Sequence, residues 1–213
     1  MNPPNVTLQR NQVAMAFGTP ISAMPWPDSD GLNAELRTVI LDKEKASGGV
    51  TRSNVGGWHS APDLLSWKHD CISTMKERII SSAGEMTRMV NAAAVQNATM
   101  KIDCWANVSR RGNYNSLHDH PASTWSGVYY VACGKKDNDD QANGKLELVD
   151  PRIGVNMLRT DIQVFEGRYL VDPNPGLMVM FPSWLKHMVH PYFGEGERIA
   201  ISFNVLIERK AGT

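Results

Sequence analysis

The segment RIAISFNVLIER, residues 198–209, alternates between two kinds of side chain. Residues two apart on a strand share a face, so one face carries Ile199, Ile201, Phe203 and Val205 and the other carries Arg198, Ala200, Ser202 and Asn204. The pattern predicts a strand with one packing surface and one polar face directed into a pocket. A guanidinium in that pocket needs an anionic partner, which is either a small dicarboxylate or a carboxylate of the chain, Glu147 or Glu166.

The same period of two marks the whole C-terminal half. It begins at Met100, and further strands are expected at 126–132, 145–149, 162–171, 177–181, 188–192 and 198–207. The polar segment 134–145 is expected to be a solvated hairpin loop. Short strands separated by Gly, Pro, Asn and Asp are typical of a sandwich or barrel of the jelly-roll type. The sequence therefore predicts a β core over residues 100–213.

The N-terminal half has helical periodicity instead. Three helices are expected, over about 28–48, from Pro62-Asp63 onward and over about 84–96. Segregated helices and strands favour an α+β chain, mainly β, with the N-terminal helices packed on one sheet. We expect the 213 residues to form a single domain in which a strand and helices within 1–99 support the core over 100–213.

Composition narrows the class of protein. Hydrophobic residues make up 42% and charged residues 21%, as in globular proteins. The 22 basic and 22 acidic residues balance to a net charge of zero, which removes the electrostatic argument for binding nucleic acid or a membrane surface. The three cysteines lack metal or redox spacing, and we find neither a secretory signal nor a membrane-spanning run. We expect a cytoplasmic protein.

Four of the six histidines form two clusters beside predicted strands. His118 and His120 are two apart and share a face of an extended chain, whereas His187 and His190 are three apart and face opposite ways. Two imidazoles from one strand and a third from a distant strand could hold iron, copper, nickel or zinc and leave other coordination positions open. The pattern predicts a metal site with only one ligand from the second cluster.

Several phrases resemble a known family. They are SNVGGWHS (53–60), NYNSLHDHP (113–121), SGVYYV (126–131), VDPR (149–152), FPSWLKHMVHP (181–191) and ERIAISFN (197–204). Their order and spacing resemble the Fe(II)- and 2-oxoglutarate-dependent oxygenases, and most closely the bacterial and phage group of 2-oxoglutarate–Fe(II) oxygenases of unknown substrate. Gly112, Tyr114 and His118 are similar to the approach to the metal in prolyl 4-hydroxylase-like members. The resemblance implies a double-stranded β-helix, the cupin-like form of the jelly roll.

The resemblance also implies roles for single residues. His118 matches the first iron ligand, His187 the distal histidine and Arg198 the anchor of the 2-oxoglutarate carboxylate. His120 stands where the family has a carboxylate ligand, so the expected metal ligands are His118, His120 and His187, with Asp119 as the alternative to His120. Further contacts to 2-oxoglutarate are expected from Tyr114, Asn115, Ser126 and Tyr130.

The implied activity is that of an Fe(II)- and 2-oxoglutarate-dependent dioxygenase. It would hydroxylate a small-molecule or peptide substrate with dioxygen, while 2-oxoglutarate is decarboxylated to succinate. Two alternatives stay open: a three-histidine cupin-type dioxygenase that uses no oxo-acid, and a non-catalytic jelly-roll binding module. No nucleic-acid or membrane partner is expected, and the sequence leaves the oligomeric state open, with a homodimer as one possibility.

Overall fold

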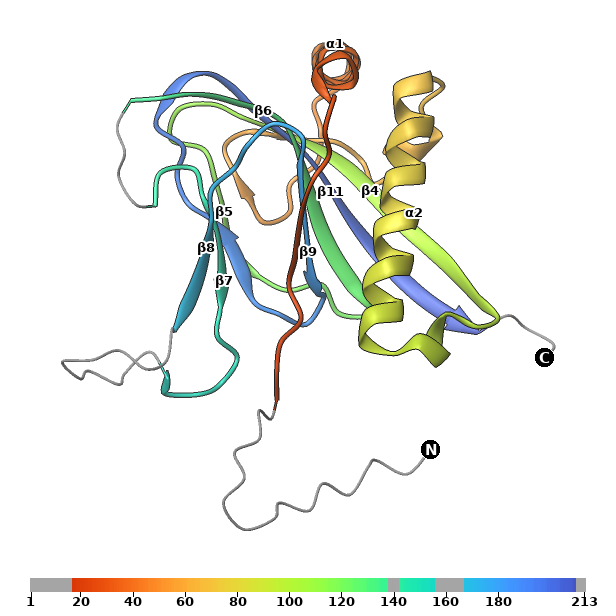
Figure 1. The fold of residues 1–213 in the computed structure, drawn as a ribbon. Helices are drawn as coiled ribbons and strands as arrows, with labels where there is room; N and C mark the ends of the chain where they lie inside the picture. The colour runs from red at the N-terminus through yellow and green to blue at the C-terminus, as the bar shows by residue number, and fades with distance from the viewer. Residues whose placement is uncertain (1–16, 138–141, 156–166, 210–213) are drawn as a thin grey trace.

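The computed structural model describes residues 17–137, 142–155 and 167–209, and its chain folds into two helices and two antiparallel sheets (Figure 1). The helices are α1 (Asp30–Ala46) and α2 (Asp70–Val90), with short 3-10 turns at Leu64–Ser66 and Ala92–Val95. The strands are β1 (Ser22–Pro25), β2 (Asn54–Val55), β3 (Trp58–His59), β4 (Ala98–Ser109), β5 (Tyr114–His118), β6 (Trp125–Lys136), β7 (Leu146–Val149), β8 (Arg168–Val171), β9 (Leu177–Pro182), β10 (His187–Val189) and β11 (Gly194–Arg209). No helix in these ranges is long and apolar enough to cross a membrane.

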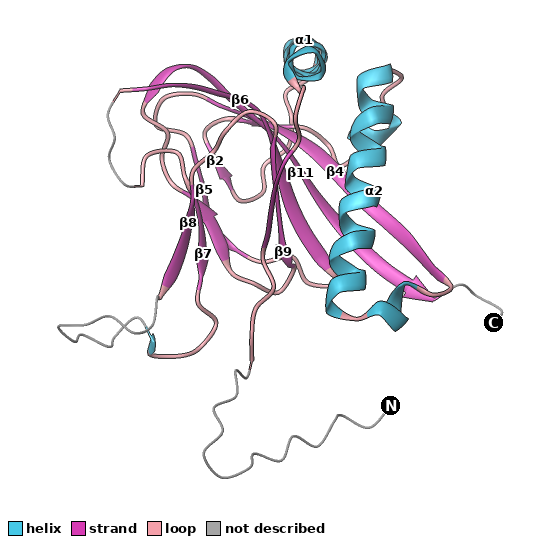
Figure 2. Cartoon of the chain, viewed as in Figure 1, coloured by secondary structure: helices cyan, strands magenta, loops and turns pink. Residues whose placement is uncertain are grey.

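The large sheet has the strand order β1-β9-β6-β11-β4-β3, and both helices lie on its outer face (Figure 2). On β11, Ile199, Ile201, Phe203 and Val205 are fully buried in the cluster that this face forms with the helices. α2 contributes Ile72, Met75, Ile79, Ala83 and Met86, which recur at helical spacing. The packing face predicted for 198–209 is thus confirmed.

The small sheet has the order β2-β5-β10-β7-β8 and covers the inner face of the large one (Figure 1). A second apolar cluster fills the space between the sheets, with Tyr130, Phe181 and Ala200 from the large sheet and Leu146, Leu148 and Val171 from the small one. Two antiparallel sheets in this arrangement form the jelly roll, so the predicted fold class is confirmed. The polar face of β11 points into the same space.

A bulge in β6 determines which residues look inward. Ile199 pairs with Ala132 and Ala200 with Tyr130, so Val131 is the extra residue opposite β11. Val131 packs toward the helices, whereas Tyr130 and Cys133 lie on the inner side. The bulge therefore brings Tyr130 beside Arg198, whose Cα partner is Cys133.

The helix predictions need two corrections. The second and third predicted helices are one helix, α2, because its apolar stripe continues from Ile79 through Ala83 to Met86 and Gly84 does not interrupt it. Pro62-Asp63 leads only into the 3-10 turn, and α2 begins at Asp70.

The strand predictions hold apart from their ends. The strand expected at 188–192 is shorter, because β10 ends at Val189 before Pro191, which has no N–H to donate to a sheet. β8 covers the described end of the segment expected at 162–171, whose residues 162–166 lie outside the described ranges, as do 138–141 of the expected hairpin loop. β1, β2 and β3 lie in the N-terminal part, where strand and helical support was predicted without strand bounds, and β5 was not among the expected strand ranges.

Candidate metal centre and its two cavities

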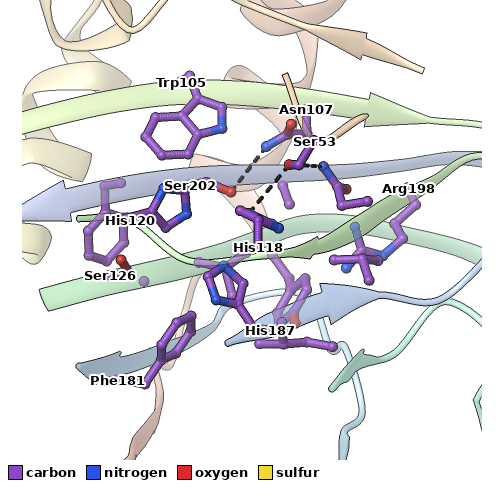
Figure 3. A pocket seen from close by; sticks show the side chains of 18 residues that line it. Ser53, Trp105, Asn107, His118, His120, Ser126, Phe181, His187, Arg198 and Ser202 are labelled. Atoms are coloured by element: carbon purple, nitrogen blue, oxygen red, sulfur yellow. Dashed lines mark hydrogen bonds between the residues drawn. The ribbon is translucent and has the colours of Figure 1, made fainter. Parts of the chain in front are cut away.

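Three histidine side chains converge between the sheets (Figure 3). His118 ends β5 and His187 begins β10, and the two are directly paired across the small sheet. His120 lies in the loop after β5, where its backbone N–H donates to the carbonyl of Ser183 at 2.9 Å. One ring nitrogen from each histidine lies within 4.8 Å of the others. Such a cluster could hold a metal ion on one side.

Backbone hydrogen bonds fix the orientation of two of these rings. The His118 Nδ1 lies 2.7 Å from the carbonyl oxygen of Ser116, and the His187 Nδ1 lies 2.8 Å from that of Leu185. A carbonyl oxygen only accepts, so each Nδ1 carries the proton and each Nε2 keeps a lone pair. In this tautomer the Nε2 atoms are the metal-binding atoms, and the carbonyls act as the supporting partners that metal-bound histidines usually have.

Burial keeps the three rings neutral. Desolvation, together with the neighbouring His118, lowers the pKa of His187 to about 3 and that of His120 to about 4. Burial also lowers the pKa of His118 itself. Neutral imidazoles are the form that binds a metal, so the site is ready for a divalent cation near neutral pH.

An inner cavity of about 50 Å³ runs from the histidines toward Arg198 (Figure 3). Its walls include Asn107, Asn115, Ser126, Tyr130 and Ser202. Arg198 is only 2% exposed, its Nε donates to the carbonyl of Gly144 at 3.1 Å, and its guanidinium lies 5.3 Å from the centre of the Tyr130 ring. A buried positive charge is therefore placed at the end of the cavity away from the histidines.

Two polar atoms at this end have no hydrogen-bond partner in the described part of the chain. They are Nη2 of Arg198 and the hydroxyl of Tyr130, both buried. Burial also raises the pKa of Tyr130 to about 12, which keeps the hydroxyl protonated and able to donate. Two orphaned donors side by side fit one carboxylate group. The residues present thus fit a ligand that reaches the metal at one end and carries a carboxylate at the other.

An outer cavity of about 530 Å³ opens on the other side of the histidines. Ser53, Trp105, His118 and His120 line both cavities, so the candidate metal centre lies where they meet. The outer walls add Arg52, His59, Pro62, Asp103, Asp119 and Asn204. A molecule in the outer cavity would face the metal position from the side opposite Arg198.

Of the other residues predicted to contact 2-oxoglutarate, Asn115 and Ser126 line the inner cavity and Tyr114 does not. Asn115 donates to the Ser53 hydroxyl at 3.2 Å, and that hydroxyl lies 3.3 Å from Nε2 of His118. Ser126 donates to Asn204 at 2.8 Å. Tyr114 lines neither cavity, so the geometry gives no support to its predicted role.

The remaining site predictions concern charge partners. Asp119 is exposed and not in the histidine cluster, so three histidines stand in place of the usual HxD…H triad. The alternative pairing of Arg198 with Glu147 is wrong, because Glu147 instead accepts from His190 at 2.7 Å and pairs with Arg168. Glu166 lies outside the described residues.

Sequence reasoning missed one aromatic residue of the site, Trp105. Trp105, in β4, lines both cavities, and its indole stacks on His59 of β3 with 5.5 Å between ring centres. The signal was present, because Trp105 alternates with Cys104 and Ala106, which face the helices, and so lies on the pocket side of its strand.

Comparison with known proteins agrees with this site. Residues 103–204 match the family model described as "Putative 2OG-Fe(II) oxygenase", which confirms the resemblance found in the sequence. These residues contain all three histidines and Arg198. No curated protein sequence matches the chain.

Solved structures share the fold at low sequence identity. A prolyl-4-hydroxylase from Pseudomonas putida matches with a TM-score of 0.61 and 14% identity, covering 89% of this chain and 92% of that one. A Trichoplax adhaerens prolyl hydroxylase in complex with a peptide of hypoxia inducible factor has a TM-score of 0.59 and 13% identity, with coverage of 87% and 83%. HygX from Streptomyces hygroscopicus, with nickel and 2-oxoglutarate bound, has a TM-score of 0.53 and 11% identity, with coverage of 88% and 82%.

Proposed function

We propose that this chain, which belongs to the 2OG-Fe(II) oxygenase family over residues 103–204, is an Fe(II)- and 2-oxoglutarate-dependent dioxygenase that hydroxylates its substrate. The observation that carries the proposal is the pair of orphaned donors, Arg198 Nη2 and the Tyr130 hydroxyl, at the far end of a cavity that begins at three histidines. A dicarboxylate is the ligand whose two ends satisfy both ends of this cavity.

The residues divide the work between them. His118, His120 and His187 would hold Fe(II), and Arg198 with Tyr130 would hold the distal carboxylate of 2-oxoglutarate. Bound iron with this co-substrate supplies the activation of dioxygen and the oxidation of an unactivated C–H bond. The chain itself orients the co-substrate through Arg198 and lines its pocket with buried side chains that keep water out.

One observation favours a second candidate, a three-histidine dioxygenase that uses no oxo-acid. His120 adds no charge where a carboxylate would add one negative charge, so the metal centre keeps a higher positive charge. This candidate leaves Arg198 without an anionic partner in the described part of the chain, and burying an unpaired guanidinium is costly. We therefore rank it second.

Anaerobic titration tests the proposal. Fe(II) is added to the protein first, then 2-oxoglutarate, while the visible spectrum is followed for the metal-to-ligand charge-transfer band. We expect one equivalent of iron and a band that saturates with one equivalent of 2-oxoglutarate. Iron binding without such a band, together with oxygen consumption that yields no succinate, would favour the second candidate. Absence of iron binding would exclude both.

A further inference from the structure

The outer cavity contains polar groups that the proposed chemistry leaves unused. Asp103 and Trp105 are two positions apart on β4, so both side chains lie on the cavity side of this strand. His59 of the neighbouring strand β3 lines the same cavity. The His59 and Trp105 rings are stacked, with an angle of 11° between their planes. This stack fixes the direction of the imidazole. The phrase around His59 was singled out in the sequence, yet neither metal nor 2-oxoglutarate binding needs it.

His59 presents an unused hydrogen-bond acceptor to this cavity. The residue is 6% exposed, and its Nδ1 lies 2.6 Å from the carbonyl oxygen of Ser60, so Nδ1 carries the proton. Burial lowers the pKa of His59, which favours the neutral ring. Nε2 therefore keeps a lone pair, and no described residue donates a hydrogen bond to it. An acceptor held in place without a donor fits a ligand that supplies an N–H or O–H.

The charged residues around the cavity also form no ion pairs within the part of the chain that the structure describes. Asp103 and Asp119 form no ion pair with any residue that the structure describes, and neither does Arg52, whose guanidinium donates only to the carbonyl of Thr51. Two carboxylates, a neutral imidazole acceptor and an indole ring favour a positively charged donor. The single guanidinium of Arg52 fits a carboxylate elsewhere in the same molecule.

We infer that the outer cavity binds an organic cation, an ammonium or guanidinium group, against Trp105, with Asp103 and His59 Nε2 accepting its N–H bonds. A basic α-amino acid, with two positive groups and one carboxylate, complements Asp103, Asp119 and Arg52. The inference rests on the proposed function in one respect, because the cation would belong to the substrate that faces the metal. A cavity of about 530 Å³ has room for such a molecule.

Calorimetric titration with matched probes tests the inference. L-arginine is compared with L-citrulline, which has the same shape without the charge, and L-lysine with L-norleucine. We expect each cation to bind at least about tenfold more tightly than its neutral counterpart, because charge-assisted hydrogen bonds are about twice as strong as neutral ones. Equal affinities would overturn the inference. A capped arginine, N-acetylarginine amide, separates the sources: equal binding indicates a side chain within a peptide, and weaker binding indicates a free amino acid held by Arg52.

Two variants locate the binding site. Asp103→Asn removes an exposed charge and should fold normally, and His59→Phe preserves the stack on Trp105 but removes the acceptor. We expect each to weaken arginine binding by about fivefold or more, as the loss of a hydrogen bond to a charged group does. Glu85→Gln, on the exposed side of α2, is the control and should change nothing. Arginine binding that is unchanged in both variants would refute the assignment.

The titrations are repeated anaerobically with Fe(II) and 2-oxoglutarate present, which separates the two proposals. If 2-oxoglutarate binds but no cation is preferred, the cation site is wrong and the proposed function stands. If arginine binds in preference to citrulline but 2-oxoglutarate does not bind, the cation site stands and the proposed function fails.

Discussion

The two cavities that meet at the three histidines are built from different kinds of residue. The inner cavity is closed by buried side chains of central strands, with Arg198 2% exposed on β11 and Tyr130 fully buried on β6. The outer cavity carries exposed charges on the rim, such as Arg52 and Asp119 in loops and Asp103 on β4. Rigid, buried groups suit one fixed ligand, whereas rim and loop residues can change without disturbing the core. The difference supports our proposals that the co-substrate binds in the inner cavity and that the outer cavity selects the substrate.

The largest expected effect is at the junction of the cavities. His187→Ala should weaken Fe(II) binding by more than about 100-fold, because removing a ligand costs more than removing a supporting residue, which costs 10- to 100-fold. His190→Ala is the matched control, because His190 bonds to Glu147 and lines neither cavity. Metal content after dialysis measures both. Loss of iron in the His190 variant alone would mean that the ligands are misassigned.

The same junction distinguishes His120 from its neighbour. His120→Ala should also remove most of the bound iron, whereas Asp119→Asn should change iron affinity by less than about threefold, as expected for an exposed charge. A competition titration with a coloured chelator gives both affinities. If the Asp119 variant loses its iron, the chain rearranges on metal binding to restore a carboxylate ligand.

Arg198 and Arg52 test the division between the cavities directly. Arg198→Met should weaken 2-oxoglutarate binding by about 30-fold or more, because losing one partner of a buried charge pair costs about 2–5 kcal/mol. Iron binding should persist. Arg52→Met, on the outer rim, should leave 2-oxoglutarate affinity within about threefold of the parent. The charge-transfer band measures 2-oxoglutarate affinity in both variants. If the two variants lose this affinity equally, 2-oxoglutarate is not confined to the inner cavity.

Acid should destabilise the metal-free protein through the histidines of both cavities. The folded chain lowers the pKa of His187 to about 3 and that of His120 to about 4, from 6.5, and also lowers the pKa of His118 and of His59. Below pH 6.5 the unfolded chain binds protons that the folded chain does not, so stability is lost as pH falls toward these values. Urea unfolding between pH 7 and about 4 should show a falling midpoint. A His187→Phe variant should show a shallower fall.

The inner cavity could be predicted from the sequence far better than the outer one. The series of short alternating strands was enough to predict the jelly roll and the inward-facing Arg198, and the two histidine clusters, with the family resemblance, predicted the three converging histidines. Their positions follow from strand periodicity and local motifs. His120 was predicted to point the same way as His118 because both would lie on one strand. It does reach the histidine cluster, but from a loop whose backbone is held by the carbonyl of Ser183.

The outer cavity could not be predicted in this way. His59 and Trp105 are 46 positions apart and meet only because β3 pairs with β4 at the edge of the large sheet. A two-residue strand has too short an alternation to be recognised. Register across strands is set by the complete packing, so the stack on His59 emerges only in the folded chain.

The smallest expected effect concerns Tyr130, and it tests whether the inner cavity is prepared for a ligand. The Tyr130 hydroxyl is buried without a hydrogen-bond partner among the residues that the structure describes, and an unsatisfied buried polar group costs about 1–3 kcal/mol. Tyr130→Phe should therefore leave the free energy of unfolding of the ligand-free protein unchanged or raise it by about 1 kcal/mol. The same variant should bind 2-oxoglutarate about fivefold more weakly, because one hydrogen bond contributes about 1 kcal/mol.

Opposite signs in these two measurements distinguish a ligand-binding hydroxyl from a structural one. Thermal unfolding is measured with and without 2-oxoglutarate in the presence of a redox-inert divalent metal, since a ligand that binds only the folded state raises its stability. We expect 2-oxoglutarate to raise the unfolding temperature of the parent protein by more than that of the Tyr130→Phe variant. The variant could instead unfold at a lower temperature than the parent without ligand and be stabilised by 2-oxoglutarate as much as the parent is. In that case the hydroxyl supports the fold, and Arg198 alone holds the carboxylate.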